Sequence, residues 1–252
     1  MTFPVYLWIG PVPIHPHVAF NIVAYVVGAR LYGVLKRRSG DVLTPEDRWW
    51  VVAAGFVGAA VGGKLLNVVD HPTLVVASLH HLLDLAAGQS IVGALVGALI
   101  AVEVTKRLIG VTRATGDMFV IPLVVGIAIG RIGCFLSGLE DHTHGLPTDL
   151  PWAVDYGDGV PRHPAQLYEI AFLLFGLLPL LAWATRLPRR DGDLFKVFMA
   201  GYLGFRLGLE FLKPGDALAG LTAIQWVCLA TLAWYARYIP AARVVRWNPD
   251  RG

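Results

Sequence analysis

The sequence predicts an all-α fold: one membrane-embedded domain over residues 1–252, built as a polytopic transmembrane bundle of seven helical spans. Hydrophobic residues make up 56% of the chain and charged residues only 15%, whereas an ordinary soluble domain carries about 25% charged residues. The apolar residues also gather in separate windows of about 20 residues, the length of a helix that crosses a bilayer. Composition and spacing together exclude an ordinary soluble domain.

An N-terminal segment precedes the first apolar window. It lacks the basic region of a cleaved signal peptide and is broken by Pro4, Pro11, Pro13 and Pro16. Trp8 and these prolines favour a short arm at the membrane interface. The seven windows that follow are residues 17–36, 49–69, 88–106, 117–136, 165–185, 195–212 and 219–238.

The basic residues are unevenly distributed between the connections. Fifteen of the 21 lysines and arginines flank the spans on one side, and the opposite connections hold Arg162 and Lys213. Because basic loops stay on the cytoplasmic side of a membrane, we expect the N-terminus outside and the C-terminus in the cytoplasm. The connection at about residues 137–163 is then an outer loop region.

Six charged residues lie inside the predicted spans, where a charge is costly and marks a candidate functional site. Arg30 and Glu103 fall near the inner ends, from which a long side chain reaches water. The other four fall in the outer halves of spans that run outward, so we expect them to converge just below the outer surface. They are Lys64, Arg131, Arg206 and Glu210.

A cationic cluster at headgroup depth needs an anionic partner. Glu210 follows Arg206 by four residues, so the two share a helix face and Glu210 can orient or neutralise this arginine. Arg131 and Lys64 then remain for a phosphate, which arginine binds through two parallel hydrogen bonds. An anionic phospholipid headgroup is the ligand expected at this depth, and salt bridges between helices without a ligand are the alternative.

The outer loop offers further polar side chains. His142 and His144 stand beside Asp141, but no other cysteine or histidine pattern of a metal site accompanies them, so we expect solvated loop residues, no metal and no cofactor. No nucleic-acid partner is expected either. His163 precedes Pro164, which favours the first turn of a helix. This histidine either orients a phosphate, acts in acid–base chemistry or only begins the helix.

Several motifs in order resemble the bacterial prolipoprotein diacylglyceryl transferase family over nearly the whole chain. They are Gly10-Pro11-Val12, Gly62-Gly63-Lys64, Gly130-Arg131-Ile132-Gly133, Pro151-Trp152-Ala153, Arg162-His163-Pro164-Ala165-Gln166-Leu167-Tyr168-Glu169 and Gly201-Tyr202 through Arg206 to Glu210. The resemblance implies an enzyme of the bacterial inner membrane with a periplasmic N-terminus and its active site toward the periplasm. It would move the diacylglyceryl group of phosphatidylglycerol to the lipobox cysteine of a prolipoprotein signal peptide, forming a thioether and releasing glycerol phosphate.

The resemblance also suggests roles for individual residues. Arg131 and Arg206 match arginines that engage the lipid phosphate and stabilise developing charge. Glu210 and His163 complete the expected catalytic set. The residues expected to bind the phospholipid are Arg131, Lys64, Arg206, Tyr25, Tyr168 and Glu169.

The sequence departs from the family pattern at four positions. Val92 stands where the family has a histidine, Cys134 and Ser137 replace asparagines, and Leu139 replaces a glutamate. Valine cannot accept a proton from an attacking thiol, so that role is absent, unnecessary or transferred to another residue. The candidates are His142, His144, His163 and Glu169. A relative that uses another acceptor and a non-catalytic lipid-binding or transport protein are the alternative functions.

Overall fold

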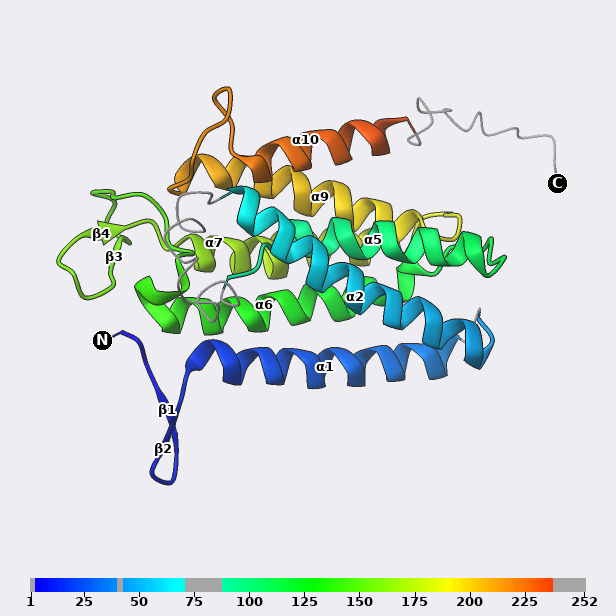
Figure 1. Ribbon diagram of the computed structural model, residues 1–252, viewed down its shortest axis with the longest axis horizontal. Helices are drawn as coiled ribbons and strands as arrows, with labels where there is room; N and C mark the ends of the chain where they lie inside the picture. Colours follow the sequence, from blue (N-terminus) through cyan, green and yellow to red (C-terminus); the bar gives the residue numbers. More distant parts are fainter. Residues whose placement is uncertain (1–2, 40–42, 71–87, 238–252) are drawn as a thin grey trace.

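The protein is a bundle of helices that run roughly along one direction (Figure 1). The computed structural model describes residues 3–39, 43–70 and 88–237. Part of the orientation prediction rests on basic residues after position 237, which lie outside the described residues. The α-helices are α1 (Pro16–Ser39), α2 (Pro45–Asp70), α5 (Ile91–Leu108), α6 (Val120–Ser137), α7 (Ala165–Ala171), α8 (Leu178–Ala184), α9 (Asp193–Leu209) and α10 (Ala223–Ala236).

Each predicted window coincides with helical structure. The fifth is continuous from α7 through a π-helix, η3 (Phe172–Leu177), into α8, and short 3-10 helices extend others: η1 (Gly116–Phe119), η2 (Gly138–Asp141) and η4 (Glu210–Leu212). Within the described residues, four helical segments are long and apolar enough to cross a membrane. They are Pro16–Arg38, Pro45–Asp70, Gly116–Asp141 and Ala165–Ala184. The apolar helices confirm the predicted membrane character of the chain.

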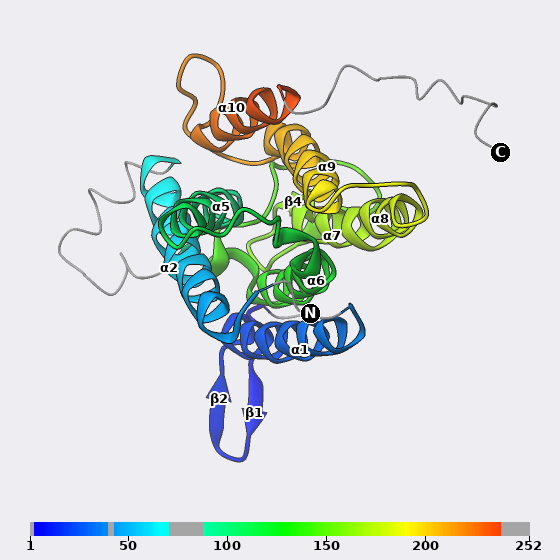
Figure 2. The same ribbon diagram turned by 90° about the vertical axis from the view of Figure 1, so that its right-hand side faces the viewer.

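Glycines allow two helices to approach very closely. A Cβ atom at Gly58 would collide with the backbone of Gly97, and one at Gly62 would collide with the backbone of Gly93. These pairs form the contact between α2 and α5, which lie side by side in the end-on view (Figure 2). The small-residue spacing of the sequence had indicated such packing.

A second close pair, α1 and α6, carries the candidate site. Gly133 of α6 faces Phe20 and the backbone of Pro16 on α1, where an added Cβ would be 2.8 Å from the Phe20 Cβ. The contact runs along both helices. It brings the first turn of α1 beside the last turn of α6, and therefore beside Arg131 and Cys134.

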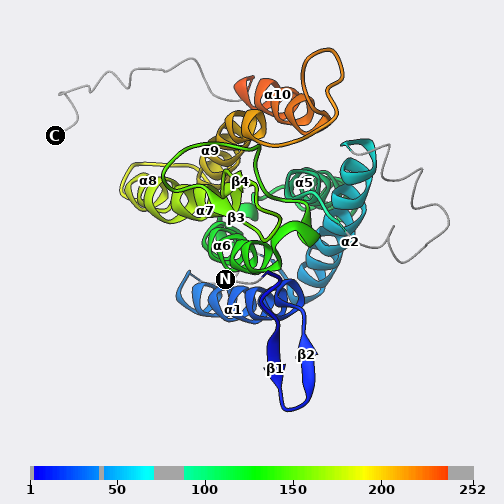
Figure 3. The same ribbon diagram turned by 90° about the vertical axis from the view of Figure 1, so that its left-hand side faces the viewer.

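Two short hairpins depart from the all-α expectation. The strands β1 (Leu7–Ile9) and β2 (Val12–Ile14) pair antiparallel around Gly10, whose φ is +60°, a value that glycine adopts without strain. This hairpin projects from the bundle (Figure 3) and exposes 67% of Trp8. The strands β3 (Val154–Asp155) and β4 (Pro161–Arg162) form the second hairpin, in the loop between α6 and α7.

That loop is anchored to the end of α9. The amide of Leu146 donates to the carbonyl of Leu212 at 2.8 Å, and the amide of Gly145 donates to the carbonyl of His163 at 2.9 Å. The loop therefore brings the start of α7 and the end of α9 together at one end of the bundle.

Candidate active site

Glu169 joins two arginines from different helices. Its Oε2 atom lies 2.9 Å from Arg131 Nε of α6 and 3.2 Å from Arg206 Nη1 of α9. Tyr202 donates its hydroxyl to the other oxygen, Oε1, at 2.6 Å. All four side chains are buried. A buried carboxylate is tolerated when it is paired and hydrogen-bonded in this way, and Glu169 is therefore the centre of a charged network that joins α6, α7 and α9.

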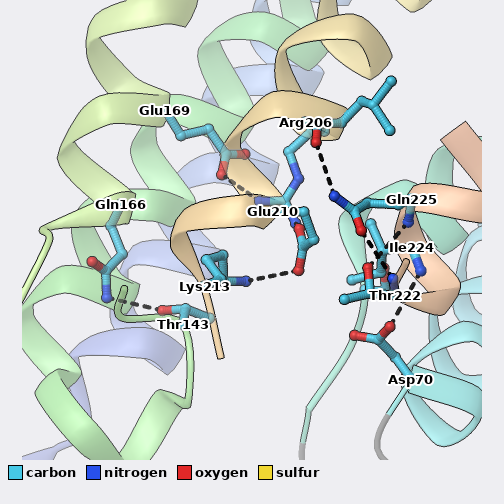
Figure 4. A network of polar contacts seen from close by, with 12 residues as sticks. Asp70, Thr143, Gln166, Glu169, Arg206, Glu210, Lys213, Thr222, Ile224 and Gln225 are labelled. Atoms are coloured by element: carbon cyan, nitrogen blue, oxygen red, sulfur yellow. Dashed lines mark hydrogen bonds and ion pairs between the residues drawn. The ribbon is translucent and has the colours of Figure 1, made fainter. Parts of the chain in front are cut away.

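The network continues to the end of α9. Glu210 Oε2 lies 2.7 Å from Arg206 Nη2, and Lys213 Nζ lies 3.8 Å from Glu210 Oε1 (Figure 4). The contact between Arg206 and Glu210, four residues apart, is the one that the sequence predicted. Burial, and then the nearby charge of Arg206, lowers the pKa of Lys213 to about 8. Three basic side chains thus face two carboxylates, which leaves one excess positive charge when Lys213 is protonated.

Both arginines have donor atoms that their acidic partners do not fully use. Arg206 Nε is buried and has no hydrogen-bond partner among the described residues. Arg131 Nη1 faces the sulfur of Cys134 at 3.7 Å, which is a weak acceptor. A buried donor without a partner is costly, so an anion that reached these atoms would be favoured.

Cys134 extends the polar contacts toward α1. Its sulfur lies 3.8 Å from His17 Nδ1, and the same nitrogen lies 2.7 Å from Asp141 Oδ1. Asp141 Oδ2 accepts a hydrogen bond from Thr143, which in turn accepts one from Gln166 Nε2 at 3.0 Å. The replaced asparagine position thus belongs to a connected polar cluster beside the arginines.

His163 and Tyr168 form a separate contact at the start of α7. His163 Nδ1 lies 3.1 Å from the Tyr168 hydroxyl, which also accepts a hydrogen bond of 2.8 Å from the exposed Trp152 indole. Tyr168 precedes Glu169 in the sequence. The two predicted polar residues of this turn thus pair with each other and with Trp152 of the loop, on the helix that carries Glu169.

The structure does not bring every predicted residue to this network. Among the described contacts, Lys64 Nζ donates to the carbonyl of Gly88 at 3.4 Å, and Tyr25 is 67% exposed on α1. The prediction that Lys64 converges with the arginines was based on depth along its helix, which does not specify the direction of the side chain, and Tyr25 was expected at the glycerol or ester region of the lipid.

The positions that depart from the family pattern differ in environment. Val92 is fully buried in the hydrophobic core, so its side chain contributes to packing and offers no polar group. Ser137 is also fully buried and donates to the carbonyl of Gly133 in its own helix. Of the replacements, Cys134 is the one that contacts the charged network.

Several residues of the site had no predicted role, among them Tyr202, Lys213, His17 and Thr143. Tyr202 precedes Arg206 by four residues and Lys213 follows Glu210 by three, so helical spacing alone indicated that they lie near these charges. His17 had no such signal, because its partners are more than 100 residues away in sequence.

The larger of two described cavities lies elsewhere. It has a volume of about 620 Å³ and is lined by Tyr32, Arg48, Phe119 and Arg189 among others. Tyr32 belongs to α1, Arg48 to α2 and Phe119 to η1, and Arg189 lies in the connection between α8 and α9.

Apolar helices long enough to cross a bilayer, packed around a buried arginine–carboxylate network, define a helical membrane protein with a candidate anion site. Comparison with known proteins gives the family. The profile of prolipoprotein diacylglyceryl transferase matches residues 4–239. The chain therefore belongs to the prolipoprotein diacylglyceryl transferase family and is a membrane transferase of this family, as the resemblance had implied.

Similar proteins cover almost all of the chain. Each of the following is named phosphatidylglycerol–prolipoprotein diacylglyceryl transferase. The protein of Bordetella parapertussis is 33% identical over 257 residues, with 95% of each chain covered. That of Vibrio vulnificus is 32% identical over 99% of this chain and 92% of its own. That of Nitrosomonas europaea is 32% identical over 93% of this chain and 90% of its own.

Proposed function

We propose that this protein transfers the diacylglyceryl group of phosphatidylglycerol to the lipobox cysteine of a prolipoprotein. The sulfur of that cysteine attacks the glyceryl carbon that carries the phosphate, the carbon–oxygen bond breaks, and glycerol phosphate leaves. The products are a thioether and a phosphate monoester. The names of the relatives support these two substrates.

The observation that carries the proposal is the buried pair Arg131 and Arg206, which share Glu169. Arg206 Nε has no hydrogen-bond partner among the described residues, and Arg131 Nη1 faces the weakly accepting sulfur of Cys134. The phosphate diester carries one negative charge, and the leaving monoester carries close to two. An arginine pair at this group therefore binds the transition state more tightly than the substrate, which is the condition for catalysis. Glu210 would hold Arg206 in position through their 2.7 Å contact.

The remaining predicted residues have subordinate roles in this proposal. Tyr168 would hydrogen-bond the glycerol or ester region, and His163 would orient Tyr168 or accept the proton of the acceptor thiol. When the phosphate enters, part of the ion pairing between Glu169 and the two arginines would be replaced by contacts with the phosphate. Both carboxylate oxygens of Glu169 are already engaged, Oε2 by Arg131 and Arg206 and Oε1 by Tyr202, which favours His163 over Glu169 as the base. Tyr25, which is exposed on α1, is the alternative to Tyr168 for the glycerol or ester contact, and Lys64 would add positive charge for the phosphate.

The proposed setting is the bacterial inner membrane. We propose that all seven helical windows span it as one domain over residues 1–252, with the N-terminus periplasmic, the C-terminus cytoplasmic and the loop at about residues 137–163 periplasmic. Glu169 belongs to α7, which lies toward the end of the bundle that carries the β3–β4 loop (Figure 1), and this position supports an active site toward the periplasm.

The direct test uses purified protein, phosphatidylglycerol vesicles and a lipobox peptide. Mass spectrometry should detect a peptide that carries the diacylglyceryl group, and the same peptide with serine for cysteine should remain unmodified. Arg131→Ala and Arg206→Ala should each lower turnover by at least about 100-fold, the effect of removing a donor to developing charge. Arg189→Ala, an arginine outside the network, should retain full activity.

Both arginine variants are expected to remain folded. Without Arg131, Glu169 keeps Arg206 and Tyr202. Without Arg206, Glu210 keeps Lys213 while Glu169 keeps Arg131 and Tyr202. Full activity of both variants would contradict the proposed role of the pair. Failure to modify any peptide, in an assay where an established family enzyme works, would contradict the proposed reaction.

A second candidate function keeps the phospholipid and changes the acceptor. It is favoured by the complete burial of Val92 in the core, where the family has a polar histidine. Release of glycerol phosphate from phosphatidylglycerol without modification of the peptide is the result that would support this function over the first.

A further inference from the structure

Three side chains with metal-binding atoms meet at the end of the bundle that carries the outer loop. They are His17 on the first turn of α1, Cys134 on the last turn of α6, and Asp141 at the end of η2. The His17 Nδ1, Cys134 Sγ and an Asp141 carboxylate oxygen all lie within 4.8 Å of one another. Atoms from three separate segments thus converge on one point.

The donor set suits a particular kind of ion. An imidazole nitrogen, a thiolate and a carboxylate oxygen are the ligand types of Zn²⁺, whereas magnesium and calcium prefer oxygen ligands alone. A thiolate and a carboxylate also balance the charge of a divalent ion. Three protein ligands leave one position open in the tetrahedral arrangement usual for zinc.

Neighbouring groups hold two of these ligands in place. Asp141 Oδ2 accepts a 3.0 Å hydrogen bond from Thr143, and Thr143 is held by Gln166, which is 1% exposed. Cys134 is buried, with Arg131 Nη1 at 3.7 Å from its sulfur. Outer contacts of this kind orient metal ligands and raise affinity.

We propose that His17, Cys134 and Asp141 bind a divalent transition-metal ion, zinc by the chemistry of the donors. The site departs from the expectation of no metal, which rested on the spacing of cysteine and histidine along the sequence. The competing interpretation is an ion pair between His17 and Asp141 with an adjacent thiol and no ion. The proposal does not rest on the proposed transferase reaction, because binding is measured without turnover.

Cobalt provides a direct test, since a thiolate bound to Co²⁺ gives a charge-transfer absorption band. Full-length protein in detergent is stripped with a chelator and titrated with Co²⁺ and then with Zn²⁺. The expected result is a band that saturates at one equivalent of Co²⁺ and disappears when Zn²⁺ displaces it. The chain has two cysteines, so Cys228→Ser is a matched control for Cys134→Ser.

The variants assign the ligands. Cys134→Ser should abolish the band, and Cys228→Ser should leave it unchanged. His17→Gln and Asp141→Asn, which keep the thiol, should weaken binding by more than 100-fold, whereas Thr143→Val should weaken it about 10-fold to 100-fold. His142→Gln, a neighbouring exposed histidine, should have no effect.

Two kinds of result would overturn the proposal. One is the absence of a cobalt band in folded wild-type protein at saturating Co²⁺. The other is a band that survives in Cys134→Ser, is lost in Cys228→Ser, or keeps its wild-type affinity in both His17→Gln and Asp141→Asn. Circular dichroism of each variant separates loss of a ligand from loss of fold.

Discussion

Glu169 Oε2 lies 2.9 Å from Arg131 Nε, and both side chains are buried inside the bundle. The two residues are separated by a loop of more than 20 residues that folds back over the same end of the molecule. This contact places a negative charge where the proposed substrate would place its phosphate. The protein therefore has an internal anion in its arginine pair before any lipid arrives.

Replacement of that internal anion should destabilise the protein and make it more responsive to phosphate. Glu169→Gln removes the charge and leaves Arg131 without an acidic partner, which costs about 3–5 kcal/mol for a buried pair. Thermal unfolding in detergent measures the loss. Added inorganic phosphate should raise the unfolding temperature of the variant more than that of the wild type. Equal stability, or equal responses to phosphate, would contradict the central role of Glu169.

The Tyr202 hydroxyl should contribute to the same network. Tyr202→Phe removes the 2.6 Å hydrogen bond to Glu169 Oε1 and leaves a buried charged acceptor unsatisfied, at a cost of about 1–3 kcal/mol. Chemical denaturation of both proteins measures the difference. Tyr235→Phe, at a buried tyrosine of α10 outside this network, is the control and should change stability less. A larger loss in the control would refute this assignment.

The contact between α2 and α5 should not tolerate an added methyl group. In Gly62→Ala the new Cβ would meet the backbone of Gly93, and overpacking of this kind costs about 1–3 kcal/mol. Gly204→Ala is the matched control, because a Cβ there meets nothing within 4 Å. It should be neutral or stabilising, since alanine favours helix. The unfolding temperatures of the two variants in detergent measure this difference, and equal values would contradict the prediction.

Lys213 should make stability depend on pH in the alkaline range. Burial lowers the pKa of Lys213 to about 8 in the folded protein, against about 10.4 for an unperturbed lysine. Between these values the unfolded chain binds more protons, so this residue makes stability rise with pH. The cost of burying the charged lysine is fully present below about pH 8 and is relieved as the pH approaches about 10.4.

Lys213→Met isolates this effect. The variant should be more stable than the wild type below pH 8, and its advantage should shrink as the pH rises toward about 10.4. Glu210 keeps its contact with Arg206 in this variant. Unfolding measured across this pH range checks the trend. An advantage that does not change with pH would show that Lys213 titrates normally.

Local sequence patterns predict much of this structure. Apolar windows predicted the positions of the helices, because a segment buried in lipid must satisfy its own backbone hydrogen bonds. The spacing of Arg206 and Glu210 predicted their contact, since residues four apart share a helix face. Composition, helical windows, family motifs and this ion pair were therefore available from the sequence by itself.

The tertiary structure alone decided which distant side chains meet. Depth along a helix predicts that Lys64 lies at the level of the arginines, but rotation about the helix axis sets the direction of a side chain, and one contact of Lys64 is with the carbonyl of Gly88. Cys134 contacts His17 because α1 packs closely on α6. Glu169 contacts Arg131 because the loop between α6 and α7 folds back and brings the start of α7 beside the end of α6. Such contacts depend on packing across many residues, which no local spacing encodes.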